Sequence, residues 1–562
     1  MPNIKVISKG GKETELTREA VAHINPDNCV NCGTCREACP VEAIHESQRE
    51  ICRACPNCTD RPAQTFKVMH AFTTKQSCTT ACPLGISPQG YVNLIKAGKL
   101  SEAYQLIWSK NPLPSVCSRI CHHPCEQACK RGVLVDEPIA IRGLKRFLSD
   151  NVDYKPAKYP SLYEERIAVI GAGSAGLAAG HFLSAEGYDV TVFECTSEAG
   201  GMLKRGIPEF RLDRAAVDKD IAKLQVAGLK FELNAPVSKA GIEELKKEYD
   251  VIIVAAGTPH SKELKIPGFR LNGVTTALDF MGSVNNKQYI MRNPQQVFDI
   301  KGEVVVIGGG SVAIDTARAA LRCGASKVTV ACLESGDAVP CHAWELEEAK
   351  AEGVEMIEGL SPISFDGAYT TLTGVTFARV TDFAKDAAGK ISFKTDASNP
   401  VSLKADWAIV AIGQYSDSIF PEADGKTVFY AGDISKSACS VIDAMASARK
   451  VAYEVDAVLR GRKVKDAQLE HTISAAPLEE KFYPFNRRRT DRNEIPELPV
   501  EERIHTFDEV EQAFTAQQAE QETQRCLGCG YEIVDADKCI GCGLCQKLCP
   551  NGSVITMIAK EN

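Results

Sequence analysis

The sequence has little of what a membrane-bound or nucleic-acid-binding protein needs. No apolar run approaches the roughly 18 residues of a membrane-spanning helix. The first residues, MPNIKVISKGGKETE, are too polar for a secretion signal. Acidic residues outnumber basic ones, 73 to 65, whereas a phosphate-binding surface needs clustered cations. We therefore expect no membrane span, no nucleic-acid partner and a cytoplasmic location.

Cysteine, by contrast, is abundant and accounts for 24 of the 562 residues. Thiols stay reduced in the cytosol, so metal binding is favoured over disulfide bonds. Thirteen of the cysteines lie between Cys29 and Cys129, and six lie between Cys526 and Cys549. At about 100 to 200 residues per domain, a chain of this length holds roughly three to five domains. We thus expect metal-binding segments at both ends of a multidomain chain.

Two runs of four cysteines have the C-x2-C-x2-C-x3-C-P spacing of bacterial ferredoxins. They are Cys29, Cys32, Cys35 and Cys39, followed by Pro40, and Cys539, Cys542, Cys545 and Cys549, followed by Pro550. Three thiolates of such a run bind one [4Fe–4S] cluster, and the fourth either completes that cluster or binds a neighbouring one. Zinc usually takes two separated C-x2-C pairs, so this spacing favours iron and sulfide.

A second group of cysteines follows a different pattern. It comprises Cys52, Cys55, Cys58, Cys78, Cys82, Cys117, Cys121, Cys125 and Cys129. The x3 spacings place successive thiols near one face of a helix, and the sequence predicts short helices within residues 91–108 and 137–151. We expect an α-helical iron–sulfur domain here. A further pair, Cys526 and Cys529 in RCLGCG, resembles the first half of a cluster motif; it could bind metal with a partner chain or simply pack.

Two glycine-rich turns follow apolar strands and open helices. The first turn, GAGSAG, contains Gly171, Gly173 and Gly176, and the second, GGGSVA, contains Gly308, Gly310 and Ala313. Such glycines let the backbone approach a pyrophosphate at a helix N-terminus. Glu194 follows the first turn by about twenty residues, the spacing at which an acid binds a ribose. This repeat predicts two Rossmann-like dinucleotide-binding domains.

The chain resembles the small-subunit family of glutamate synthase in five segments: CPLGISPQGYVNLIKAGKLSEAY, NPLPSVCSRICHHPCEQAC, VIGAGSAGLAAGHFL, GGMLKRGIPEFRL and VIGGGSVAIDTARAAL. The same flavoprotein module occurs in dihydropyrimidine dehydrogenase and in ferredoxin:NADP transhydrogenases. The resemblance covers roughly residues 50 to 460. It implies FAD in the first Rossmann unit, NAD(P)H in the second and two [4Fe–4S] clusters in the helical part. Hydride transfer would be carried by FAD and nicotinamide, so we expect no catalytic side chain.

The resemblance also implies ligands. One cluster would take two of Cys52, Cys55 and Cys58 together with Cys78 and Cys129, and the other would take Cys82, Cys121 and Cys125. Relatives can place a fourth ligand of the second cluster where this chain has Lys145, which cannot ligate while protonated; Cys117 could replace it. By the same resemblance, Gly201 belongs to the FAD site, and Gly432 and Asp433 hold the ribityl and phosphate part of FAD.

The second nucleotide is either NADH or NADPH. Family members that prefer NADPH usually carry an arginine pair at the end of the strand after the second glycine turn, where this sequence has Leu333 and Glu334. A carboxylate repels a 2′-phosphate and suits a 2′-hydroxyl, which favours NADH. Arg318 and Arg322 on the neighbouring helix leave NADPH open.

The predicted fold is a multidomain α/β protein with two Rossmann-like domains, the nucleotide domain being inserted in the FAD domain. An α-helical bis-[4Fe–4S] domain and ferredoxin-like segments at both ends complete it. The expected boundaries are 1–60 for the N-terminal ferredoxin-like segment, 61–158 for the helical iron–sulfur domain, 159–295 and 426–465 for the FAD domain, 296–425 for the NAD(P)H domain, 466–525 for a linker with one helix and 526–562 for the C-terminal ferredoxin-like segment.

These features predict an NAD(P)H-linked oxidoreductase that exchanges hydride between nicotinamide and FAD and passes single electrons, through about four [4Fe–4S] clusters, to or from a redox protein such as ferredoxin. The ferredoxin-like ends favour a subunit of a hetero-oligomeric complex of transhydrogenase, hydrogenase or formate dehydrogenase type, with or without electron bifurcation. The alternatives are a stand-alone NAD(P)H:ferredoxin or NAD(P)H:acceptor oxidoreductase and a glutamate synthase small subunit. A flavin disulfide reductase is disfavoured because the region after Glu194 contains only Cys195 before a long cysteine-free stretch, and so has no C-x2-C pair.

Overall fold

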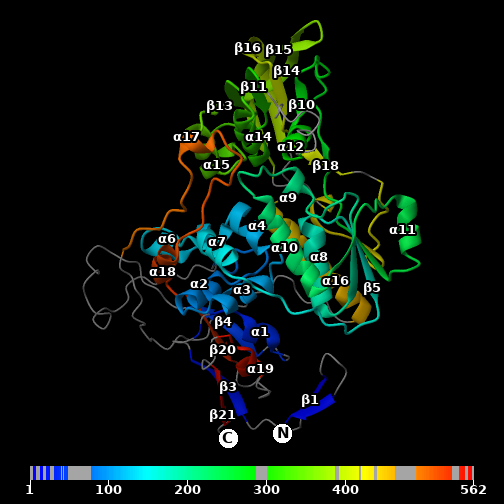
Figure 1. Ribbon diagram of the computed structural model, residues 1–562, viewed down its shortest axis with the longest axis vertical. Helices are drawn as coiled ribbons and strands as arrows, with labels where there is room; N and C mark the ends of the chain where they lie inside the picture. Colours follow the sequence, from blue (N-terminus) through cyan, green and yellow to red (C-terminus); the bar gives the residue numbers. More distant parts are fainter. Residues whose placement is uncertain are drawn as a thin grey trace.

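The computed structural model describes residues 4–7, 13–16, 20–25, 29, 31–39, 41, 43–48, 78–286, 300–386, 391–416, 419–435, 440–461, 489–534, 544–550 and 555–559. Figure 1 shows two sheet domains, a helical domain beside them, and a small unit in which both ends of the chain meet. Within these ranges, no helix has the length and apolar character needed to cross a membrane.

The helical domain consists of α2 (Pro88–Lys96), α3 (Leu100–Trp108), α4 (Pro114–Ile120), α5 (Pro124–Gln127), α6 (Lys130–Leu134) and α7 (Ile141–Asn151). Ser87 caps α2, its hydroxyl accepting a hydrogen bond from Gly90 N at 3.1 Å. Gly98 (φ +71°) provides the left-handed residue that ends α2 before α3 begins. Both stretches predicted to be helical are therefore confirmed, the first as two helices.

The first sheet is parallel, with the order β19-β8-β5-β6-β7. Its strands are β5 (Arg166–Ile170), β6 (Asp189–Phe193), β7 (Lys230–Glu232), β8 (Val251–Val254) and β19 (Val428–Tyr430). The central strands β5 and β8 are buried apolar runs, as a sheet covered on both faces requires. α8 (Ser174–Glu186) packs against α16 (Val441–Arg460). Because β19 and α16 follow the second sheet domain in sequence, the first domain is split as predicted.

The second sheet is also parallel, with the order β10-β17-β11-β12-β13. Its strands are β10 (Val274–Thr276), β11 (Glu303–Ile307), β12 (Lys327–Ala331), β13 (Glu355–Ile357) and β17 (Trp407–Val410), and the antiparallel strands β14 (Leu360–Ala368), β15 (Thr371–Lys385) and β16 (Ile391–Lys404) project from it. The boundary expected at 295/296 comes earlier in the structure, because Val274 of β10 already pairs with Ala408 of β17. A strand of three residues carries too little periodicity to be recognised from sequence.

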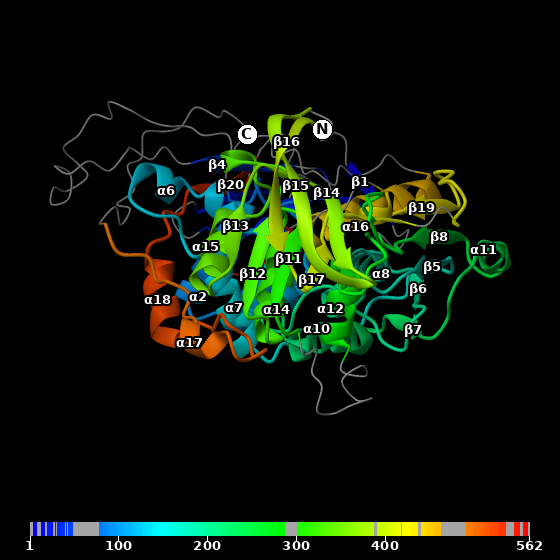
Figure 2. The ribbon, with the colours of Figure 1, turned by 90° about the horizontal axis from the view of Figure 1, so that it is seen from above.

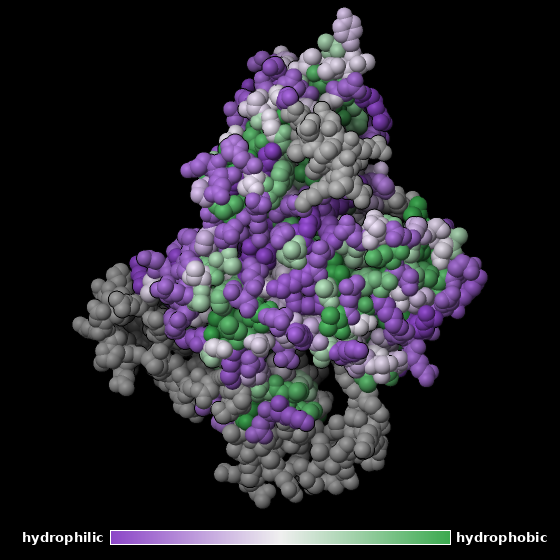
Figure 3. Space-filling view, in the orientation of Figure 1, coloured by the Kyte–Doolittle hydropathy of each residue, from purple (hydrophilic) through white to green (hydrophobic). Residues whose placement is uncertain are grey.

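Residues 489–525, which we name the strap, include α17 (Val500–Arg503) and α18 (Ala516–Gln524). The strap was predicted as part of a linker but packs on the helical domain: Arg142 Nη2 donates to Glu511 Oε1 at 2.6 Å, and Arg146 Nη2 donates to Glu509 Oε2 at 2.5 Å. In both ribbon views α18 lies at the opposite end of the molecule from α11 (Lys239–Leu245) (Figure 1, Figure 2). Hydrophilic residues cover much of the face between the second sheet domain and the helical domain (Figure 3).

The two ends of the chain form one folded unit, which we name the end unit. It contains β3 (Ala20–Ile24), α1 (Thr34–Ala38) and β4 (Ile44–Gln48) from one end, and β20 (Gly530–Val534), α19 (Leu544–Leu548) and β21 (Ile555–Ala559) from the other. β20 pairs antiparallel with β4, and β21 pairs antiparallel with β3. Val21, Ile24, Ile44 and Ile555 form its core. The two ferredoxin-like segments, which sequence treats as separate, therefore fold together.

Candidate functional site

The first glycine turn lies between β5 and α8. Gly171 has φ +102°, and a Cβ atom on Gly176 would lie 1.8 Å from Gly171 O, so helix and strand can pack this closely only without side chains. Gly173 differs, because no atom lies within 4 Å of the place where its Cβ would be. This open space at the N-terminus of α8 is a cradle for a phosphate group. The loop thus fits a dinucleotide on geometric grounds.

Glu194 and Gly201 complete this side of the site. The buried Glu194 carboxylate follows β6, and it accepts hydrogen bonds from Ala172 N at 2.9 Å and from Thr196 Oγ1 at 2.9 Å. These bonds fix the acid against the glycine turn. Gly201 (φ +55°) lies directly over the turn, since its Cβ would be 3.0 Å from Gly173 Cα. Both residues therefore lie beside the first glycine turn.

Gly432 and Asp433 follow β19. Gly432 has φ +76°, and a Cβ there would lie 2.6 Å from the Cβ of Ala175 on α8, so the return segment packs against the start of the fingerprint helix. Asp433 lines the same cavity as the glycine turn. α16 begins soon after at Val441, where Ser440 Oγ accepts from Asp443 N at 3.3 Å. The pair thus lies beside the first glycine turn and the cavity.

The second glycine turn lies between β11 and α14 (Ser311–Arg322). Gly308 has φ +134° and closely approaches Ala411, whose carbonyl oxygen would be 2.3 Å from an added Cβ. Ala313 is fully buried in the packing between α14 and the sheet. Gly310, like Gly173, has no atom within 4 Å of a Cβ position. The second turn therefore repeats the first, with its own open helix N-terminus.

Glu334 lies just beyond the end of β12 and lines the cavity next to the second turn. The two arginines that could have served a 2′-phosphate are engaged elsewhere. Arg318 Nη2 donates to Glu352 Oε1 at 2.6 Å, and Arg322 Nη1 donates to Glu352 Oε2 at 2.7 Å. These hydrogen bonds lower the pKa of the Glu352 carboxyl to about 2, although burial alone would raise it. Both guanidinium groups thus belong to a buried ion cluster.

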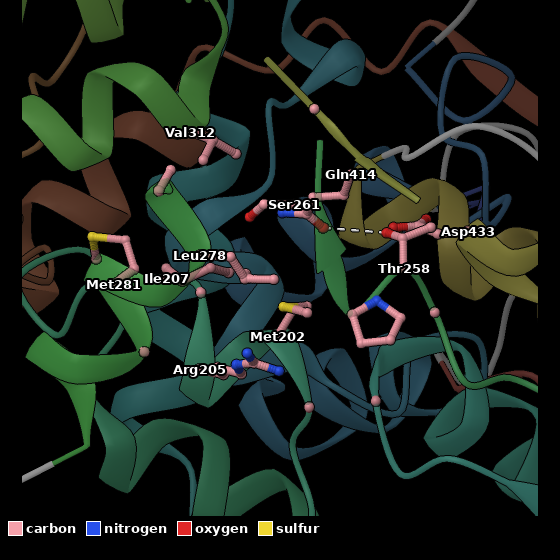
Figure 4. Close-up of a pocket in the computed structure, with 18 of the residues that line it drawn as sticks. Met202, Arg205, Ile207, Thr258, Ser261, Leu278, Met281, Val312, Gln414 and Asp433 are labelled. Carbon is pink, nitrogen blue, oxygen red and sulfur yellow. Dashed lines mark hydrogen bonds between the residues drawn. The ribbon is translucent and has the colours of Figure 1, made fainter. Parts of the chain in front are cut away.

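One large cavity of about 1880 Å³ joins the two glycine turns. It is larger than the roughly 300 to 1,000 Å³ of a usual ligand pocket and therefore has room for two dinucleotides. Figure 4 shows side chains from both domains around it, including Met202 and Arg205 of α9 (Met202–Arg205) and Met281 of α12 (Ala277–Asn285). The cysteines among its described lining are Cys195 and Cys332, which stand beside different turns. Neither forms the adjacent pair that a disulfide reductase needs.

Lys145 on α7 is buried, and four thiols lie near enough to raise its pKa, although burial opposes its positive charge. We name them the inner thiols; they are Cys82, Cys117, Cys121 and Cys125. Cys117 stays the predicted replacement for the fourth ligand. Four thiols are the number of donors that a [4Fe–4S] cluster takes.

Helix α16 connects the cavity with the loop that follows Cys82. Ser440, Val441 and Ala444 at the start of α16 line the cavity. Farther along α16, Arg449 Nη1 donates to the Leu84 carbonyl at 2.5 Å, two residues from Cys82. No sequence motif marks Arg449, because its role arises only when the split domain meets the helical one.

The end unit gathers most of the described cysteines of the two ferredoxin-like runs. Cys35 and Cys545 are buried in its core, with Cys29, Cys39 and Cys549 packed around them. Backbone N–H groups donate to two of the sulfurs, Asn31 N to Cys29 Sγ at 3.4 Å and Ala43 N to Cys39 Sγ at 3.2 Å. Cys32 packs toward the helical domain. Five further predicted ligands lie outside the described residues: Cys52, Cys55, Cys58, Cys539 and Cys542.

The remaining predicted ligands, Cys78 and Cys129, lie together in a small buried cavity. The thiols beside them are those of Cys526 and Cys529, the pair to which sequence assigned no partner. The C-x2-C spacing was the signal that singled out this pair. Its neighbours could not be inferred, because they lie in a distant part of the chain.

Comparison with known proteins agrees with this arrangement. Residues 70–156 match the model for dihydropyrimidine dehydrogenase domain II with its 4Fe-4S cluster, residues 165–438 match pyridine nucleotide-disulphide oxidoreductase, and residues 22–45 and 532–554 match the 4Fe-4S binding domain.

Three relatives extend the likeness over most of the sequence. The NADP(+)-dependent formate dehydrogenase subunit beta of Moorella thermoacetica is 31% identical over 510 residues, 80% of this chain and 70% of the relative. The glutamate synthase [NADPH] small chain of Azospirillum brasilense is 28% identical over 420 residues, 68% and 86% of the two chains. The NAD-dependent dihydropyrimidine dehydrogenase subunit PreT of Escherichia coli O157:H7 is 29% identical over 448 residues, 75% and 95% of the two chains. The chain therefore belongs to the glutamate synthase small-subunit type of FAD- and NAD(P)-binding iron–sulfur oxidoreductases.

Proposed function

We propose that this chain is the NADH-oxidising electron-relay subunit of a larger redox complex, with its cavity as the entry point and its end unit as the exit. The observation that carries the proposal is that one helix, α16, borders the cavity and also contacts the loop that follows Cys82. Ala444 lines the cavity, and Arg449 on the same helix holds the loop that follows Cys82. A rigid helix that borders both sites keeps their separation fixed, as electron transfer requires.

FAD and the clusters, when bound, supply hydride acceptance from nicotinamide and the transfer of single electrons. The chain's own contribution is to position them. Gly173 and Gly310 leave the N-termini of α8 and α14 open toward the shared cavity, where their partial positive charge suits a pyrophosphate. Glu194 is held rigidly beside the first turn, where a ribose hydroxyl would donate to it.

NADH is the proposed nucleotide. Glu334 lines the cavity beside the second turn, where its negative charge would repel a 2′-phosphate and accept a hydrogen bond from a 2′-hydroxyl. Arg318 and Arg322 are committed to Glu352, and Lys327 pairs with Glu355 at 2.9 Å. The relatives are named for NADP(+), NADPH or NAD, so their names do not favour one nucleotide. The proposal of NADH therefore rests on the residues of this chain.

We count about four [4Fe–4S] clusters, one on the inner thiols, two in the end unit and a fourth considered below. In two-cluster ferredoxins, the fourth cysteine of each run ligates the cluster of the other run. Cys549 would accordingly join Cys29, Cys32 and Cys35, while Cys39 would join the C-terminal run. The shared core of the end unit, which contains Cys35 and Cys545, supports this exchange.

A protein partner at the end unit fits the arrangement of the molecule. The end unit lies at the far end of the molecule from the second sheet domain, so the nucleotide and a partner would use different surfaces (Figure 1). Relatives are named as subunits or small chains. The alternative is a stand-alone NADH:ferredoxin oxidoreductase.

Anaerobic purification from the native host tests the proposal. We expect bound FAD, co-purifying subunits, and appearance of reduced-cluster EPR signals when NADH is added. Absence of FAD, or clusters that stay oxidised with NADH while dithionite reduces them, contradicts the proposed electron path. Rapid reduction of free ferredoxin by the isolated chain favours the stand-alone enzyme instead.

A further inference from the structure

We propose that Cys78, Cys129, Cys526 and Cys529 bind a [4Fe–4S] cluster, so that the C-terminal RCLGCG segment completes a site in the helical domain. The role of this cluster, to carry electrons, rests on the proposed function. Its binding by the four cysteines does not. The binding itself rests on the positions of the four side chains and on the contacts that hold their segments.

The four thiols enclose one buried cavity, which Thr79 and Gln89 also line. Cys78, Cys129 and the pair Cys526 and Cys529 come from three separate segments of the chain and meet at this one cavity. Four cysteines are the donor set that a [4Fe–4S] cluster takes.

The RCLGCG segment is held in place on both sides of its cysteines. Before them, Arg131 Nη1 donates to the Arg525 carbonyl at 2.6 Å, and Arg525 Nη2 donates to the Glu137 carbonyl at 2.9 Å. After them, Gln89 forms hydrogen bonds with both backbone groups of Gly530. Between the cysteines, Leu527 is buried. The segment is therefore a built part of the helical domain and not a loose tail.

The spacing of the thiols favours a cluster over a single zinc ion. Tetrahedral zinc with sulfur ligands at about 2.3 Å needs thiols roughly 4 Å apart. Among the described residues, the group of potential ligands that lie within 4.8 Å of one another is Glu348, Glu497 and Glu511, and no three cysteines meet this limit. Thiols that share a cavity but stand farther apart suit a larger core.

The site lies between the inner thiols and the end unit. On one side, α2 carries both Gln89 of the cavity lining and the fully buried Tyr91, which packs in the same core as Cys121 and Cys125. On the other side, Asn31 lines the cavity and donates its N–H to Cys29 Sγ. A cluster here would shorten each electron step along the proposed path.

The test is a pair of matched double variants of the full-length chain, purified anaerobically. The variant Cys526→Ser with Cys529→Ser should contain less iron and sulfide than the native chain, by the amount of one [4Fe–4S] cluster. After reduction with dithionite it should lack one set of EPR signals, and its FAD content should be unchanged. Cys52→Ser with Cys55→Ser, which removes the ligands that family resemblance implies, should retain all iron of the helical domain. The reverse result, with iron lost from the second pair and kept in the first, would overturn the proposal.

Three further readouts keep the test decisive. Zinc in the native chain in place of iron refutes a cluster directly. Cys529→Asp retains a possible ligand, so we expect full iron with one altered EPR signal; an unaltered spectrum counts against ligation. If NADH fails to reduce the native chain while the iron loss occurs as expected, the proposed function fails and this site stands.

Discussion

Gln89 and Gly530 are joined by two reciprocal hydrogen bonds. Gln89 Nε2 donates to the Gly530 carbonyl at 2.6 Å, and Gly530 N donates back to Gln89 Oε1 at 2.8 Å. A side-chain amide on α2 thus pairs with the backbone at the start of β20 as a neighbouring strand would. This pairing is how the helical domain fixes the direction in which the chain leaves Cys529 and enters the end unit.

Removal of the amide should loosen this junction. Gln89→Leu leaves two buried backbone groups of Gly530 unpaired, at a cost of about 1 to 3 kcal/mol for each. We expect a lower thermal midpoint and faster release of iron to a chelator under anaerobic conditions. Gln225→Leu, an exposed change on α10 (Arg214–Ala227), is the matched control and should behave as the native chain does. Equal iron release from both variants would contradict this role.

Substitutions at Gly173 and Gly310 should affect the two nucleotide sites separately. Gly173 (φ −78°) and Gly310 (φ −85°) have backbone conformations that any residue adopts, so valine fills the cradle without straining the chain. Gly173→Val should fold but lack the visible absorbance of FAD. Gly310→Val should keep FAD, which dithionite but not NADH then bleaches. Each variant is the control for the other, and loss of FAD from both would mean that the glycines are needed for folding alone.

The charge at residue 334 should set the nucleotide preference. Glu334→Arg exchanges a negative for a positive charge beside the cavity, an effect on the order of 1 to 4 kcal/mol at short range. Since 1.4 kcal/mol corresponds to about tenfold, the NADPH-to-NADH ratio of kcat/KM should rise by roughly tenfold or more. Asp337→Arg makes the same charge change on the exposed 3-10 turn (Gly336–Ala338) outside the cavity lining, and should leave the ratio unchanged. A ratio equal in all three proteins would refute the NADH assignment.

Lys145 should raise the reduction potential of a cluster on the inner thiols. Reduction adds negative charge, which the buried ammonium stabilises; at an effective dielectric constant near 20 the effect of a nearby unit charge is on the order of 1 to 4 kcal/mol. Lys145→Met keeps the length and removes the charge, so EPR-monitored titration should give a lower potential with the iron content unchanged. The exposed Lys158→Met serves as control. A potential that stays constant or rises would show that Lys145 fills space only.

Asp220 on α10 makes stability depend on pH. Burial raises its pKa to about 6, while Oδ2 accepts a hydrogen bond from Val116 N at 3.1 Å. A raised carboxyl pKa favours the folded state at low pH, and this contribution is lost as pH rises from about 4, the unfolded value, through about 6. Asp220→Asn keeps an acceptor for Val116 without the charge.

The thermal midpoint of Asp220→Asn relative to the native protein should therefore increase between pH 4 and pH 6.5 and stay level above that. The full difference corresponds to about 3 kcal/mol for a shift of two pKa units. Asp153→Asn, at an exposed position, should show no such trend. A difference that is flat across this range would mean that Asp220 does not titrate with folding.

Local motifs were predictable because their signals lie within short stretches. The strand, glycine turn and helix around Gly171 and Gly308 occupy about 30 residues each, and the C-x2-C-x2-C-x3-C spacing is shorter still. Both sheet domains, the split of the first one, the helices of the iron–sulfur domain and the family followed from these patterns. Gly173, Gly310 and Glu334 then lie around one cavity, as their motifs suggested.

Contacts between distant segments could not be predicted in the same way. Cys526 and Cys529 were recognised as a pair, but nothing in their own segment points to Cys78 and Cys129. The charged residues of the strap suggested a solvated linker, whereas Glu509 and Glu511 meet arginines of the helical domain. A single sequence identifies the chemical type of each side chain. It does not identify the distant residues that the fold places beside that side chain.

The pairing of β21 with β3 gives the biosynthesis of this protein a fixed order. Val21 and Ile24 leave the ribosome roughly 530 residues before their strand partners Ile558 and Ile555. At about 5 to 20 residues per second, β3 therefore stays unpaired for roughly half a minute or longer. During that time its free edge can pair with another chain and aggregate. A chain that ends before β21 would lack the strand that completes the end unit.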